Sequence, residues 1–169
     1  ALMVQCEAEA RALSRMLHPS DDRPQRLTFA QLPGLALVGA PGEVRSAISN
    51  VVNNAVRYTP TGGAIDVRWH ILPGGGARLD VTDTGTGIPP EHLSRLGERF
   101  YRVDRSRSRE SGGTGLGLAI TKHVVQRHGG ELQISSALGQ GSCFSLLFPA
   151  QRVRLPIDAA AAEHQPARS

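Results

Sequence analysis

Two asparagines one helical turn apart are the first residues whose types and spacing suggest chemistry. Asn50 and Asn54 lie in the segment 43–58, and Arg57 follows at the next helical position on that side. On a helix of 3.6 residues per turn, these two carboxamides and the guanidinium share one face beside an apolar arc. A carboxamide oxygen suits Mg²⁺, and a guanidinium suits phosphate. The same pattern also describes a solvated helix face, so this helix alone leaves both interpretations open.

A glycine-bearing turn follows a segment of alternating apolar residues, which predicts a strand that ends beside Asp83. A carboxylate buried at that point needs hydrogen-bond donors, and the exocyclic amine of a purine is one. Gly85 and Gly87 let the backbone approach a flat ring or adopt a positive φ angle. An ordinary Asp-Gly turn is the competing interpretation of these residues.

A third glycine-rich segment, 113–118, opens a predicted helix. Amide groups and the positive dipole end at a helix N-terminus hold phosphate oxygens. The segment is not a dinucleotide-binding fingerprint, because position 118 is Leu and a polar stretch rather than a strand precedes it. That stretch carries five arginines between Arg99 and Arg109 against the single acid Asp104, which is typical of a loop that meets phosphate.

The elements that must position these residues alternate between helical and strand patterns. Helices are predicted over 1–17, 43–58, 91–96 and 114–128, and strands over 26–31, 35–38, 64–72, 77–82, 131–136 and 142–148. Pro33-Gly34 predicts a hairpin between the first two strands. We therefore expect an α/β fold, a two-layer α/β sandwich with a mixed sheet and three main helices. One domain should span 1–149, followed by a C-terminal tail at 150–169.

Composition excludes several classes of protein. The chain has 169 residues, a net charge of +4 and a single lysine, Lys122, which follows neither a Walker-A loop nor a protein-kinase glycine loop. Two cysteines, Cys6 and Cys143, are too few for a zinc cluster and are expected to be reduced core residues. Because no apolar run is long enough to cross a bilayer, we expect a soluble segment without membrane contact.

The order of the motifs is more specific than any motif alone. Asn50-(x)₃-Asn54, Asp83-x-Gly85-x-Gly87, Phe100, Gly113-x-Gly115-x-Gly117 and Gly139-x-Gly141 together resemble the N, G1, F, G2 and G3 boxes of the sensor histidine kinase catalytic domain. The resemblance spans about residues 1 to 149. Within that family, the runs 45–50 and 98–104 resemble the phosphate-regulon sensor kinases. The resemblance implies a Bergerat ATP-binding fold, which gyrase B, Hsp90 and MutL share.

The resemblance also implies ATP and Mg²⁺ as cofactors and assigns roles to residues. Asp83 would accept from the adenine amine, with Ser142 assisting through water, and Asn54 would coordinate the metal. Residues 100–113 would form an ATP lid whose arginines approach the γ-phosphate, and Asn50, Arg57 and Arg105 would be catalytic. The expected nucleotide-binding residues are Asn50, Asn54, Arg57, Tyr58, Asp83, Gly85, Gly87, Ile88, Phe100, Gly113, Thr114, Gly115, Leu116, Gly117, Leu118 and Ser142. Arg57 stands where the family often has Lys, and its planar fork should still meet phosphate.

The implied function is donation of the γ-phosphoryl group of ATP to a histidine on a separate dimerisation domain of a two-component sensor kinase. None of the histidines at 18, 70, 92, 123 and 128 has the sequence context of a phospho-acceptor, and His164 lies in the predicted tail. The expected partners are therefore the histidine-bearing dimerisation helices and a response regulator. We expect a monomeric cytoplasmic domain of an inner-membrane-anchored kinase.

Two other functions compete with this one. A self-contained ATPase of the same superfamily needs a Glu where this chain has Asn50, and a carboxamide cannot take a proton from water. A basic module that binds nucleic acid is consistent with the sequence pI of 9.8. Aromatic residues make up only 4% of the chain, which disfavours a base-stacking surface, so we expect no nucleic-acid partner.

Overall fold

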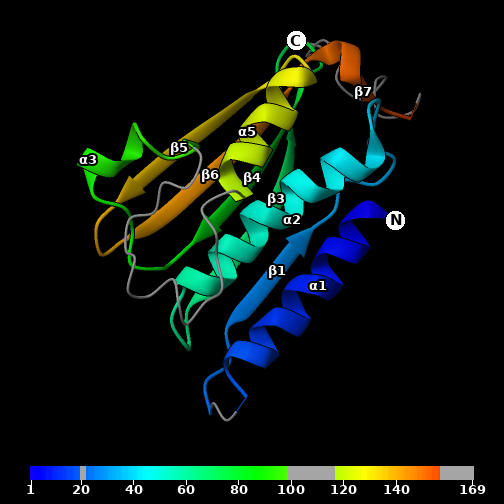
Figure 1. Cartoon of the computed structure of the whole chain (residues 1–169). Helices are drawn as coiled ribbons and strands as arrows, with labels where there is room; N and C mark the ends of the chain where they lie inside the picture. Colours follow the sequence, from blue (N-terminus) through cyan, green and yellow to red (C-terminus); the bar gives the residue numbers. More distant parts are fainter. Residues whose placement is uncertain (20–21, 99–116, 157–169) are drawn as a thin grey trace, which may run out of the picture.

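The computed structural model describes residues 1–19, 22–98 and 117–156, and all structural statements below concern these residues. A five-stranded mixed sheet carries a layer of helices on one face (Figure 1). In chain order the elements are α1 (Leu2–Leu17), β1 (Arg26–Ala30), β2 (Ala36–Leu37), α2 (Pro41–Tyr58), β3 (Ala64–Ile71), β4 (Ala77–Asp83), α3 (Pro90–Leu93), α5 (Gly117–Arg127), β5 (Glu131–Ala137), β6 (Gly141–Phe148), a 3-10 helix (Ala150–Arg152) and β7 (Val153–Arg154). This arrangement confirms the predicted two-layer α/β sandwich.

The main sheet has the strand order β1-β3-β4-β6-β5. β1 pairs in parallel with β3, and the other neighbours pair antiparallel, which makes the sheet mixed as expected. In the register of β4 and β6, Asp83 at the end of one strand lies opposite Ser142 at the start of the other. Two residues far apart in sequence thus meet where the neighbouring strands β4 and β6 end and begin.

The core lies between α2 and the inward-facing side chains of the sheet. α2 begins at Pro41, whose fixed φ and missing N–H suit the first turn of a helix. Its apolar arc, predicted from the 3.6-residue period, is buried. The residues that meet there are Val44, Ile48, Val51, Val52 and Ala55 from α2 and Ile65, Val67, Leu79, Val81 and Leu146 from the sheet. Burying each of the larger side chains contributes about 1.5–3 kcal/mol, so this packing fixes which face of α2 is left for polar residues.

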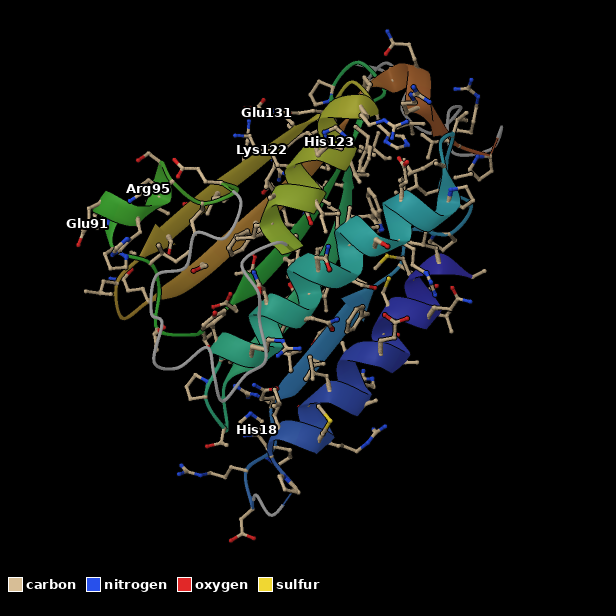
Figure 2. The ribbon with its side chains drawn as sticks, viewed as in Figure 1. His18, Glu91, Arg95, Lys122, His123 and Glu131 are labelled. Carbon is tan, nitrogen blue, oxygen red and sulfur yellow. The ribbon has the colours of Figure 1, made fainter. Side chains whose placement is uncertain are left out.

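α1 and α5 flank α2 in the same layer (Figure 1). The contact between α5 and α2 includes a buried hydrogen bond, because Thr121 Oγ1 donates to the carbonyl oxygen of Ala47 over 3.0 Å. Lys122 and His123, one and two residues further along α5, are exposed (Figure 2). None of the described helices is long and apolar enough to cross a membrane.

Two expectations about the strands were wrong. The predicted hairpin around Pro33-Gly34 does not form, because β1 joins the main sheet whereas β2 pairs antiparallel with β7 in a separate two-stranded sheet. The predicted tail begins too early, since Val153 and Arg154 form β7 and Val153 is buried. Cys6 is a free, buried cysteine as predicted, whereas the free Cys143 is only partly buried.

Candidate functional site

Asp83 is the most buried carboxylate among the described residues of the predicted site, with 6% of its surface exposed. Its Oδ1 accepts a hydrogen bond from the backbone N–H of Gly85 over 2.8 Å. Burial raises the pKa of the Asp83 carboxyl, and the backbone N–H groups of Gly85 and Ser142 act against that rise. The strand end therefore holds a carboxylate that is desolvated, fixed in direction and still able to accept from a ligand.

The glycines around Asp83 are required by close approach of the backbone. A Cβ on Gly85 would lie 2.6 Å from the carbonyl oxygen of Tyr58, so only glycine lets the turn pass the end of α2. Gly141 has a φ angle of 103°, and a Cβ there would overlap the carbonyl oxygen of Asp83. Both positions belong to boxes that the sequence singled out.

The polar face of α2 carries the predicted ligands. Asn50, Asn54 and Arg57 are partly buried, and Tyr58 at the end of the helix is exposed. Asn50 Nδ2 donates to the carbonyl oxygen of Gly117 over 3.2 Å. This bond fixes the orientation of the Asn50 amide and leaves its Oδ1 available as an acceptor or ligand.

A buried glutamine holds the end of α2 in place, which sequence reasoning missed. Gln25 Nε2 donates to the carbonyl oxygens of Val56 and Thr59, and Gln25 Oε1 accepts from Ser14 Oγ over 2.8 Å. The last carbonyl groups of a helix have no partner within the helix, so a side-chain amide can satisfy them. Gln25 thereby ties the turn that bears Arg57 and Tyr58 to α1. Its position before a predicted strand gave no signal for this role.

The start of α5 adjoins the polar face of α2. Gly117 is the first residue of α5, and a Cβ there would lie 3.5 Å from Asn50 Cγ. Leu118 packs against the core. The remaining predicted residues of this part of the site, Phe100, Arg105, Gly113, Thr114, Gly115 and Leu116, lie outside the described residues.

A serine on β5 joins two of the glycine-bearing segments and was also missed. Ser136 Oγ accepts a hydrogen bond from the backbone N–H of Ile88 over 2.8 Å. The same hydroxyl lies 3.0 Å from the carbonyl oxygen of Gly141 and 2.8 Å from Ser142 Oγ. The structure thus brings Ile88 and Ser142, both predicted site residues, into one hydrogen-bond network.

Metal-binding capacity at the site depends on amide oxygens. No group of three or more His, Cys, Asp or Glu side chains that could hold a metal ion occurs within 1–19, 22–98 and 117–156. Carboxamide oxygens of Asn50 and Asn54, together with the phosphates of a nucleotide, are a donor set that suits Mg²⁺, which rarely has an all-protein cage. The residues present therefore fit a magnesium–nucleotide complex rather than a free metal.

Comparison with known proteins identifies the family of the chain. The profile of the family described as histidine kinase-, DNA gyrase B-, and HSP90-like ATPase matches residues 39–152. The phosphate regulon sensor protein PhoR of Pseudomonas aeruginosa is 50% identical over 152 residues, covering 89% of this chain and 33% of the relative. The sensor-like histidine kinase SenX3 of Mycolicibacterium smegmatis is 41% identical over 138 residues, covering 82% of this chain and 36% of the relative. The chain thus spans about a third of the length of these relatives.

Solved structures show the same fold. The mycobacterial sensor histidine kinase MprB superposes with a TM-score of 0.70 at 31% identity, covering 91% of this chain and 97% of that one. Full-length ShkA, solved in complex with AMPPNP, gives a TM-score of 0.69 at 28% identity, covering 92% of this chain and 30% of that one. The chain therefore belongs to the family of histidine kinase-, DNA gyrase B- and HSP90-like ATPases, and within it to the catalytic domains of sensor histidine kinases.

Proposed function

We propose that this domain binds ATP with Mg²⁺ and donates the γ-phosphoryl group to a histidine on a separate dimerisation domain. The observation that carries the proposal is the buried Asp83 carboxylate at the end of β4, beside the polar end of α2. The backbone N–H of Gly85 donates to this carboxylate, which has further acceptor capacity for a ligand, and the amine of adenine is a suitable donor.

Different residues of the chain bind different parts of the nucleotide. Asp83 recognises the adenine amine, with Ser142 beside it. Asn54 and Asn50 face the phosphates from α2, and Arg57 offers a fork of donors to phosphate oxygens. The amide groups at the start of α5 add the positive end of a helix dipole. Mg²⁺, when bound, neutralises phosphate charge and orients the transferring group.

The residue type at position 50 supports an acceptor outside the chain. Asn50 occupies the position at which an ATPase of the superfamily would need a Glu to activate water, and its amide donates to Gly117 instead. Phosphoryl transfer is then limited by the supply of an in-line nucleophile. An imidazole presented by dimerisation helices supplies it, so the domain alone should hold ATP with little hydrolysis.

The wider setting is part of the same proposal. Relatives such as PhoR are sensor proteins, which leads us to propose a response regulator as the downstream partner and phosphate regulation as the signalling context. We also propose that the domain is monomeric by itself, lies in the cytoplasm where ATP is available, and works as the kinase segment of a membrane-anchored sensor. Roles for Phe100, Arg105 and residues 113–116 stay predictions from sequence.

The test is a transfer assay with γ-labelled ATP and a separate protein that carries the dimerisation helices of the kinase. Acid-labile phosphohistidine should form on the partner with the wild-type domain, and Asn54→Ala should abolish transfer. Asn53→Ala is the matched control, because it removes a neighbouring carboxamide to which we assign no role in binding. Rapid phosphate release by the domain alone would support the ATPase instead, and label on the domain's own histidines would contradict the proposed acceptor.

A further inference from the structure

The two segments that frame Asp83 are joined by the hydroxyl group of one residue. The turn after Asp83 continues to Ile88, and the turn between β5 and β6 leads into Gly141 and Ser142. Ser136 Oγ lies within hydrogen-bond distance of Ile88, Gly141 and Ser142. We propose that Ser136 is a positioning residue that holds the adenine pocket in its binding geometry.

The Ser136 hydroxyl has a single hydrogen, so it can donate to only one of its neighbours at a time. Ser136 has one hydrogen and accepts from the backbone N–H of Ile88. Its hydrogen goes either to the carbonyl oxygen of Gly141 or to Ser142 Oγ. When it goes to Ser142, the Ser142 hydroxyl keeps its own hydrogen for a ligand. When it goes to Gly141, the 2.8 Å contact requires Ser142 to donate to Ser136, which leaves Ser142 as an acceptor.

This choice bears on the recognition of a purine. Position N1 of adenine accepts a hydrogen bond, whereas N1–H of hypoxanthine donates one. Ser142 lies opposite Asp83 in the strand register, so its hydroxyl faces the same edge of a base, directly or through a water molecule. When Ser136 donates to Ser142, the hydrogen that Ser142 keeps suits N1 of adenine and not a base that carries a hydrogen at N1. The inference is that binding of adenine selects this arrangement.

A backbone hydrogen bond holds the middle of the Asp83 turn, so the part of the turn that depends on Ser136 is its end. The backbone N–H of Gly139 donates to the carbonyl oxygen of Thr86 over 2.7 Å, which attaches the middle of the Asp83 turn to the β5–β6 turn. Ser136 attaches the end of the same turn at Ile88. Without Ser136 Oγ, the N–H of Ile88 loses its partner, and the fraction of molecules in the binding geometry falls. Apparent affinity falls by that same fraction.

The inference rests on the proposed ATP binding and is tested with Ser136→Ala, Ser136→Thr and Ser135→Ala in the full 169-residue chain. Ser135 is the matched control, because it lies next to Ser136 on the exposed side of β5. Ser136→Ala should raise the exchange rate of the Ile88 amide without nucleotide and raise the Kd for ATP about fivefold. The ratio of the Kd for inosine triphosphate to that for ATP should fall as well. Ser136→Thr, which keeps the hydroxyl, should match wild type in the exchange rate, in the Kd for ATP and in the ratio of the two Kd values.

The outcomes separate the inference from the function beneath it. If wild type binds ATP and Ser136→Ala matches Ser135→Ala in exchange rate, affinity and selectivity, Ser136 is not a positioning residue. A loss of affinity equal for ATP and inosine triphosphate would overturn the selectivity role. Failure of the wild-type chain to bind ATP would overturn the proposed function itself. Should Ser136→Ala not fold, Ser136→Cys, which keeps a similar volume with a poorer acceptor, takes its place in the same measurements.

Discussion

His128 Nε2 accepts a hydrogen bond from the backbone N–H of Ala40 over 3.2 Å. Its Nδ1 lies 2.7 Å from the carbonyl oxygen of Val124, which can only accept, so Nδ1 donates to it. The bond joins the end of α5 to the start of α2, where Ala40 is the N-cap residue without a side-chain cap of its own. Gly39 makes room for the ring, because a Cβ there would lie 2.5 Å from His128 Nε2.

A matched pair of substitutions at His128 should separate its two hydrogen bonds. Gln places its amide oxygen where it can accept from Ala40, whereas Asn reaches only as far as Val124. Each variant keeps one of the two bonds, so we expect each to be less stable to unfolding than wild type by about 1 kcal/mol, the usual net contribution of one hydrogen bond. Urea unfolding of wild type and both variants measures these differences. A stability of His128→Asn equal to that of wild type would show that the bond to Ala40 contributes nothing to the junction of α5 and α2.

Asp83 should make folding dependent on pH. Burial raises the pKa of this carboxyl above its ordinary value of 3.8, so the folded protein holds the proton more tightly than the unfolded chain. The free energy of unfolding should therefore fall as the pH rises from about 4 to the raised pKa. The free energy of unfolding should be measured against pH for wild type and for Asp83→Asn. The difference between the two curves should isolate this fall, because Asn does not titrate. An identical pH dependence in the two proteins would contradict the effect of burial on Asp83.

The same variant should weaken nucleotide binding. Asn at position 83 offers an amide donor towards the amine of adenine unless the side chain flips, and flipping competes with the hydrogen bond from Gly85. We expect the Kd for ATP to rise about tenfold or more in calorimetric titration, consistent with loss of a charge-assisted bond of about 1.5–3 kcal/mol. An unchanged Kd for ATP would show that Asp83 does not recognise adenine.

Local patterns predicted the main helices well, because helix formation depends on residues that are near in sequence. The 3.6-residue period of α2 located its buried arc, and Pro41 and the Thr59-Pro60 step gave its limits to within two residues. Strand pairing depends on segments that are distant in sequence, and for this reason the hairpin predicted at Pro33-Gly34 was wrong. The turn itself is real, since Gly34 has a φ angle of 77°, but it directs the chain to β7 instead of back along β1.

The supporting residues of the site escaped prediction for a similar reason. Gln25 and Ser136 belong to no motif of chemical residues, and each acts through contacts with backbone groups at least five positions away in the chain. Ordinary polar residues beside strands give no periodic signal of such partners. By contrast, Asp83 and Asn50 were singled out from the sequence because their types and spacing point to a ligand, and their roles stay predictions.

Two glycines with nearly equal φ angles should differ sharply on substitution by alanine. Gly87 has a φ of 73° and Gly139 a φ of 77°, so both substitutions carry the cost of a left-handed residue, about 1 kcal/mol. A Cβ at Gly87 would overlap the carbonyl oxygen of Ala137, whereas one at Gly139 meets nothing within 4 Å. Gly87→Ala should therefore lose more unfolding free energy and more ATP affinity than Gly139→Ala. Equal losses would show that the strained φ angle alone explains both glycines.

Asn50→Asp tests whether the link between α2 and α5 contributes to nucleotide binding. The change keeps an oxygen that could serve as a ligand but removes the Nδ2 donor, so a carboxylate then faces the carbonyl oxygen of Gly117. Repulsion should displace the start of α5, and we expect the Kd for Mg²⁺–ATP to rise about tenfold. Ser46→Asp is the control, since it adds the same charge to an exposed position one turn earlier on α2. If calorimetry gives both variants the same Kd, added charge explains the loss and the Asn50–Gly117 bond has no part in holding the nucleotide.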